Sequence, residues 1–239
     1  MRGAGDIIRL RSDKMYSDKV VPAIKSFLRK PLVIFTFVLY VVVSAISVVS
    51  GFIGTGGENP DITVDACVTI LVTGSMIIAY CFSASKNNVS IETGVLSTLK
   101  RLLILRVVGT VLLVAMSGFS VVGEPEYIFL PFLMIAFGAV YVFATVKGIE
   151  FLDSIICAID YSYPDTSAPR IVGVLQFVLA PLSLVSVFIG RIGVLSVITA
   201  LLGVIFHVCF GFVLLQYLDY MKNLRLEIME EDLQKTQTK

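Results

Sequence analysis

The sequence predicts an all-α integral membrane protein with six transmembrane helices, arranged as three hairpins. Of its 239 residues, 56% are apolar and only 15% are charged, whereas soluble domains are about 45–50% apolar and about 25% charged. A helix needs about 20 apolar residues to cross roughly 30 Å of hydrocarbon. Runs of this length occur at 31–53, 64–85, 102–122, 128–146, 171–190 and 194–217.

Residues that begin helices or form turns separate the six runs. Pro31 opens the first run at the first helical position, where a missing N–H costs no hydrogen bond. Turns rich in glycine or acidic residues join the two runs of each hairpin, at 54–61, 123–126 and 190–193. The chain is therefore expected to consist of three parts: a basic amphipathic segment at 1–30, a six-helix domain at 31–222 and a tail at 223–239.

Positive charge is distributed unevenly between the two sides of this domain. Of the 19 Lys and Arg residues, only Arg191 falls on a hairpin turn, and eight lie in residues 1–30. Lys and Arg favour the cytoplasmic side, so we expect both termini in the cytoplasm and the protein in a plasma membrane. The connection at 147–170 carries more acids than cations, but acids contribute little to this rule.

The second and fourth runs end in similar sequences. AYCFSASK at 79–86 and VYVFATVK at 140–147 each place a Tyr ahead of a Lys. The similarity indicates either a duplicated hairpin or independent selection of residues suited to a cytoplasmic membrane interface. Arg106 lies about one turn inside the third run, where its stem favours reaching the headgroups over a buried role. The expected interfacial anchors are Tyr80, Lys86, Arg106, Tyr141 and Lys147.

Two cytoplasmic segments have amphipathic patterns. In the first, an apolar stripe with cations around it predicts an interfacial helix drawn to anionic lipid, or simply a basic flank that sets topology; the stripe comprises Val20, Val21, Ile24, Phe27 and Leu28. The second lies at 149–160, where isoleucines and a leucine form one helical face and Glu150, Asp153 and Asp160 lie on the other. An acidic helix is not attracted to an anionic leaflet, so we expect it to dock on the basic N-terminal segment or on a partner subunit.

The tail at 223–239 is expected to continue the sixth helix for a few turns and to fray from 233 onward. The three carboxylates of 149–160 follow no recognised ligand spacing, so we predict no metal there.

A candidate polar site lies inside the membrane, in the last hairpin. His207 is the only histidine, and Pro181 interrupts the fifth run and frees the carbonyl of Phe177. A tight turn near 192 brings Phe177 level with His207, and Gln176 is adjacent. We expect His207 to donate to the freed carbonyl. The alternative is a mid-membrane cavity, lined by the kink, His207 and Gln176, that binds a substrate or a proton.

No catalytic or cofactor motif is present. A single histidine excludes two-histidine metal motifs, and neither a GxSxG elbow nor a phosphate-binding loop occurs. The four cysteines form no CxxC pair, and the basic residues lack the aromatic neighbours typical of nucleic-acid binding. We therefore predict no catalytic residues, no cofactor, no metal and no nucleic acid.

Three classes of function remain. The first is an accessory or scaffold protein that acts through lipid or protein contacts, with a partner at the cytoplasmic face. The alternative is the membrane subunit of a transporter for an apolar or lipid-like substrate, as the Pro181 kink suggests. An intramembrane enzyme is least favoured, because it needs paired titratable groups at one depth. The sequence indicates no oligomeric state.

Overall fold

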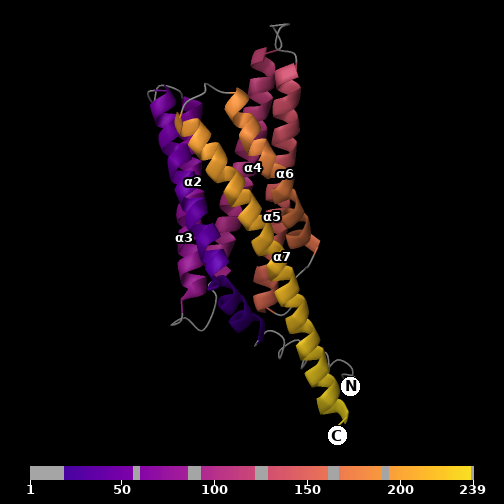
Figure 1. Cartoon of the computed structure of the whole chain (residues 1–239). Helices are drawn as coiled ribbons and strands as arrows, with labels where there is room; N and C mark the ends of the chain where they lie inside the picture. Colours follow the sequence, from indigo (N-terminus) through magenta and orange to yellow (C-terminus); the bar gives the residue numbers. More distant parts are fainter. Residues whose placement is uncertain are drawn as a thin grey trace.

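The described part of the chain is built from helices. The computed structural model describes residues 19–55, 60–85, 93–121, 129–160, 167–189 and 194–237, and contains no strand within them. A helix over 19–28, called here the N-terminal helix, precedes six longer ones (Figure 1). These are α2 (Pro31–Thr55), α3 (Pro60–Ala84), α4 (Thr93–Val121), α5 (Phe129–Asp160), α6 (Ser167–Ile189) and α7 (Val194–Gln237).

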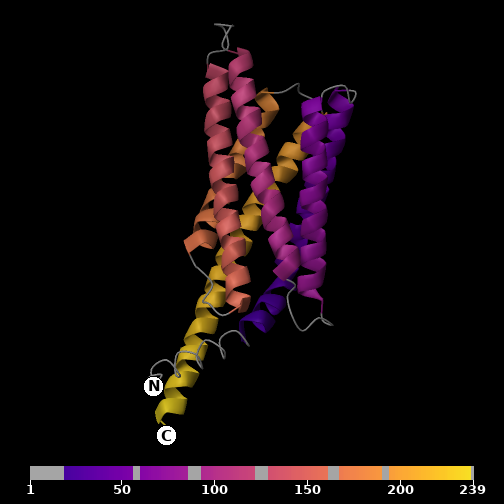
Figure 2. The same cartoon turned by 180° about the vertical axis from the view of Figure 1, so that it is seen from behind.

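The six long helices form a closed ring. Each packs against the next along the chain, and α7 packs against α2 to complete the circle. The N-terminal helix lies at an angle across one end of the bundle, the end where α7 extends beyond its neighbours (Figures 1 and 2). Lys19 forms an ion pair with Glu231, which ties the first described helix to the end of the last.

The outer surface of the ring is apolar, which confirms a helical membrane protein. Within the described residues, five helices contain a stretch long and apolar enough to cross a membrane: Pro31–Ile53, Asp65–Ala84, Ile135–Ile156, Ser167–Leu184 and Val194–Glu231. Large apolar side chains such as Phe35 and Leu201 are each 53% exposed on this surface. Such exposure suits lipid as the surrounding solvent. α4, which holds the third expected run, lies in the ring between α3 and α5.

Local sequence explains where the helices begin. Pro31 and Pro60 stand at the first positions of α2 and α3, the place in a helix where proline is best tolerated. The N-terminal helix closes with a hydrogen bond from the Lys30 N–H to the Phe27 carbonyl, 3.0 Å long. The Arg29 Nε donates to the carbonyl of Ala84 at 2.8 Å, which satisfies one of the last carbonyls of α3.

Two helices extend further than the sequence indicated. We expected 149–160 to form a separate interfacial helix, but it is the last part of α5. Between the fourth run and this segment, the only residue that disfavours a helix is Gly148. One glycine weakens a helix but does not end it, so the helix continues through this position. We also expected fraying from 233, whereas α7 continues to Gln237. Ile228, only 1% exposed, and the Lys19–Glu231 pair hold this end against the N-terminal helix.

The N-terminal helix packs on protein. Val20, Ile24 and Phe27 are 0%, 4% and 3% exposed and belong to the main apolar core. Phe27 meets Tyr217 edge to face, with ring centres 5.4 Å apart, and Lys30 lies over the Tyr220 ring at 4.6 Å. The apolar stripe that suggested lipid binding is therefore covered by α7 and its neighbours.

Candidate functional site: a central cavity

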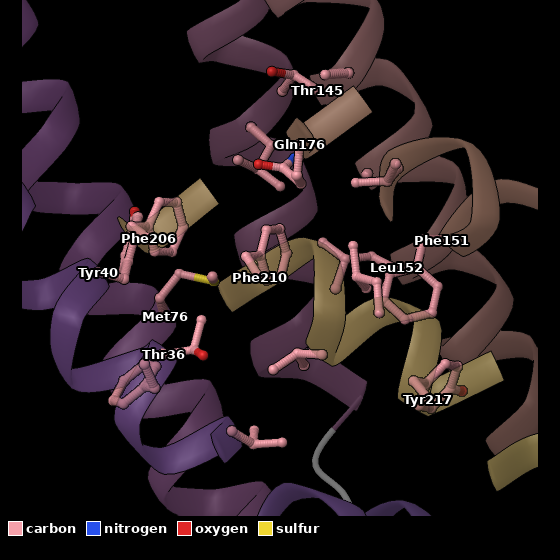
Figure 3. Close-up of a pocket in the computed structure, with 18 of the residues that line it drawn as sticks. Thr36, Tyr40, Met76, Thr145, Phe151, Leu152, Gln176, Phe206, Phe210 and Tyr217 are labelled. Carbon is pink, nitrogen blue, oxygen red and sulfur yellow. The ribbon is translucent and has the colours of Figure 1, made fainter. Parts of the chain in front are cut away.

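A cavity of about 380 Å³ lies at the centre of the helix ring. Every long helix contributes to its wall, and the N-terminal helix adds Ile24, Phe27 and Leu28. Figure 3 shows side chains from several helices that converge on it. The wall is mainly apolar. Its polar members are Thr36, Tyr40, Tyr80, Arg106, Tyr141, Thr145, Gln176, His207 and Tyr217.

The polar pair of the last hairpin lies in the cavity wall. Nδ1 of His207 is 2.7 Å from Oε1 of Gln176, and since a carboxamide oxygen only accepts, the ring nitrogen donates. Gln176 is only 6% exposed, and Figure 3 shows its amide directed into the cavity. Glycines allow α6 and α7 to approach closely here. A Cβ added to Gly203 would lie 3.5 Å from the Ser183 Cβ.

The expected bond from His207 to the carbonyl of Phe177 is replaced by this pair. The Phe177 ring instead packs edge to face on Phe212 at 5.3 Å and fills the space beside Gly211. Pro181 is exposed and does not line the cavity. We expected the backbone carbonyl of Phe177 to be the acceptor nearest to His207. The acceptor is instead the side-chain oxygen of Gln176, one residue earlier.

Arg106, which we expected to be an interfacial anchor, lines the cavity. Its guanidinium carbon lies 5.5 Å from the centre of the Tyr141 ring, and both residues line the cavity. Tyr141 was also expected at the interface. Both side chains point inward because they lie on the faces along which α4 and α5 pack.

The remaining expected anchors also contact protein where they are described. Tyr80 donates to the carbonyl of Leu28 at 2.9 Å and stacks on Phe37 with ring centres 4.1 Å apart. It therefore fastens the N-terminal helix to α3. Lys147 pairs with Glu150 at 2.7 Å. Lys86 lies outside the described residues.

The acidic residues of 149–160 are paired within the chain. Glu150 binds Lys147 of its own helix, and Asp153 forms an ion pair with Lys100 of α4. The side chain of Asp160 lies outside the described residues. The basic partner we expected, the N-terminal segment, instead pairs through Lys19 with α7. Phe151 of the acidic segment packs on Tyr217 of α7, with ring centres 5.3 Å apart.

The cavity has an unbalanced charge. Arg106 is the one residue of its wall that is charged at neutral pH, and no described carboxylate lines it. Among the described residues, no three His, Cys, Asp or Glu side chains gather closely enough to hold a metal ion.

Sequence reasoning missed the aromatic side chains that shape the cavity. Phe206 and Phe210 lie one turn apart on α7, with ring centres 5.6 Å apart, and Phe206 also meets Tyr40 of α2 at 5.6 Å. The spacing of four residues places both on one helical face. This spacing can be read from the sequence. It does not stand out there, because apolar residues occupy every face of this helix.

Comparison of the chain with protein-family models, curated proteins and solved structures finds no match.

Proposed function

We propose that this protein binds an apolar or lipid-like molecule in its central cavity, as the membrane subunit of a transporter and without a catalytic step of its own. The observation that carries the proposal is the cavity itself, which is mainly apolar and is lined by all six helices of the ring. Its volume of about 380 Å³ lies within the range of roughly 300–1,000 Å³ that is usual for small-molecule sites.

We propose in addition that all six long helices cross a plasma membrane and that both termini are cytoplasmic. The N-terminal helix and the far end of α7 lie together, at the end where most cations of the sequence are expected. α7 has 44 residues, about 66 Å of helix, so a large part of it extends beyond roughly 30 Å of hydrocarbon.

The position of the N-terminal helix supports transport over permanent storage. It forms the cavity wall at the proposed cytoplasmic end, and it is joined to the ring by a turn at residues 29–30. Its displacement would open the cavity to that side without rearranging the ring. Transporters expose a central site by moving one element against another.

A pair of glycine substitutions tests the binding function. A Cβ added to Gly148 or to Gly109 meets nothing within 4 Å, and only Gly148 lines the cavity. Protein purified from its native membrane in mild detergent is examined by native mass spectrometry. We expect a bound lipid-like species in the parent and in Gly109→Leu, and its loss in Gly148→Leu. Equal retention in both variants, or no bound species in the parent, contradicts the proposal.

An accessory role remains a second candidate, because α7 carries an apolar stripe near its end. Leu226, Met229 and Leu233 are 58%, 49% and 62% exposed and recur at helical spacing. They lie in the part of α7 proposed to be cytoplasmic, where a helix of a partner subunit would cover them. A stoichiometric partner that co-purifies with the parent and with Glu227→Gln, but not with Met229→Glu, would support this role.

A further inference from the structure

Arg106 is the unusual feature of the cavity. Its guanidinium faces an apolar chamber, and its described contact there is the Tyr141 ring at 5.5 Å. Among the described residues, no carboxylate forms an ion pair with it, whereas Lys19, Lys100 and Lys147 each have one. A cation inside a membrane is costly and usually has a functional partner.

The rest of the wall does not supply that partner. The hydroxyls of Thr36 and Thr145 donate to carbonyls of their own helices at 2.8 Å. Gln176 accepts from His207 through its oxygen, which leaves its amide N–H groups as donors toward the cavity. Of the described polar groups in the wall, the guanidinium of Arg106 is the only one with a full charge, and together with the amide donors it suits an anion or another hydrogen-bond acceptor.

The volume and the apolar surface define the other part of the ligand. A cavity of about 380 Å³ lies near the small end of the range for ligand sites, which favours one alkyl chain over the two chains of a membrane phospholipid. Aromatic and aliphatic side chains of the wall, including Phe27, Phe151 and Phe210, provide the surface for that chain.

We infer that the cavity binds a single-chain amphiphile with an anionic head, a carboxylate or a phosphate monoester, and that Arg106 binds the head. The inference rests on the proposed binding function and specifies its substrate class. Arg106 acts as a specificity-determining residue: it neutralises the head, while the apolar wall accepts the chain regardless of charge. A neutral or cationic amphiphile of equal length leaves the guanidinium without a counter-ion and binds less tightly.

The absence of tryptophan from the sequence allows a single-reporter experiment. Phe210→Trp places a reporter in the cavity wall, and Phe35→Trp places one on the outer surface. Each protein is reconstituted into phosphatidylcholine nanodiscs and titrated with brominated single-chain amphiphiles that quench tryptophan. The amphiphiles share one chain length and carry a carboxylate, phosphate, alcohol or trimethylammonium head. Quenching of the Phe35→Trp protein corrects for partition into the bilayer.

We expect an anionic amphiphile to quench the cavity reporter at a concentration about tenfold lower than the alcohol, the factor that one charge-assisted hydrogen bond supplies. Whichever of the carboxylate and phosphate amphiphiles quenches at the lower concentration identifies the preferred head. Adding Arg106→Gln to the Phe210→Trp protein is expected to remove the preference, and Arg106→Lys to retain part of it. The head-group series on the protein with Arg106 intact is informative even where Arg106→Gln fails to fold.

The outcomes separate this inference from the function on which it rests. If all four heads quench the cavity reporter equally, or if Arg106→Gln folds and keeps the preference for anions, the cavity binds alkyl chains and the inference about Arg106 is wrong. If no amphiphile quenches the cavity reporter beyond the outer one, binding itself is absent and both proposals fail.

Discussion

His207 and Gln176 are joined across the α6–α7 interface by a hydrogen bond of 2.7 Å between Nδ1 and Oε1. The two side chains come from α6 and α7, which pack against each other, and both line the central cavity. The bond satisfies two polar groups that would otherwise face hydrocarbon. It also holds the glutamine amide in one orientation in the cavity wall.

The first prediction concerns the energy of this pair. His207→Leu is expected to lower the free energy of unfolding by about 1–3 kcal/mol, because it leaves the buried side-chain oxygen of Gln176 without a hydrogen-bond donor. The double variant His207→Leu/Gln176→Leu is expected to lose less than the sum of the single changes. Reversible unfolding in mixed micelles measures all three. Strict additivity would show that the two side chains do not interact in the folded protein.

The prediction for this region rested on short-range geometry. A tight turn expected between two apolar runs would bring residues at equal distances from it to one level, and that argument placed residue 177 opposite His207; the structure joins His207 to the neighbouring residue, Gln176. Which polar atom the histidine then meets depends on side-chain reach and on the rotation of each helix. Those quantities follow from packing, and the sequence contains no direct signal for them.

Arg106 shows the same limit more strongly. Its distance from the cytoplasmic end of the third run allowed either a headgroup contact or a buried position. α4 is apolar around most of its circumference, so its hydrophobic pattern does not indicate which side faces α5. The contact with Tyr141 and the central cavity arise only when six helices close into a ring, a long-range property that no local pattern encodes.

The second prediction tests the close approach of α6 and α7. A Cβ at position 211 would lie 2.9 Å from two ring carbons of Phe177 and 3.1 Å from the carbonyl oxygen of Gly173. Gly211→Ala is therefore expected to lower the free energy of unfolding by about 1–3 kcal/mol through overpacking. The same micelle unfolding experiment measures the effect.

Gly109→Ala is the matched control, because a Cβ there meets nothing within 4 Å. This change is expected to be neutral or to stabilise α4 by up to about 1 kcal/mol through helix propensity. Combining Gly211→Ala with Phe177→Leu, which removes the obstructing ring atoms, is expected to recover part of the loss. A Gly211→Ala protein as stable as the parent would contradict the observed contact.

The third prediction concerns the ion pair between Lys100 of α4 and Asp153 of α5. The two side chains are 30% and 46% exposed, so solvent screening limits the pair to about 0.2–1 kcal/mol. Asp153→Lys is expected to destabilise slightly more than this, because it places two cations together. The exchange Lys100→Asp/Asp153→Lys is expected to restore most of the loss, as measured by thermal unfolding at low and at high salt. No recovery in the exchanged variant at low salt would argue against the pairing.

The fourth prediction concerns the N-terminal helix as the movable wall of the cavity. Phe27 is 3% exposed and lies between the rings of Tyr217 and Tyr220, with centres 5.4 Å and 5.7 Å away. Phe27→Ala removes a buried aromatic side chain, a change that typically costs about 3–5 kcal/mol. Because the helix is joined to the ring by a short turn, we expect this cost to appear as local release of residues 19–28 while the six-helix ring stays folded.

Hydrogen–deuterium exchange in nanodiscs measures that release. Phe27→Ala is expected to speed exchange in residues 19–28 and in the end of α7 that contacts them, and to leave the middle of α2 unchanged. Phe35→Ala, at a ring residue that is 53% exposed, is the control and is expected to change neither region. Uniformly faster exchange in every helix would mean that Phe27 stabilises the whole bundle, because the N-terminal helix would then be an inseparable part of the ring. Faster exchange confined to the N-terminal helix and its contact on α7 would identify the element whose displacement opens the cavity at that end of the bundle.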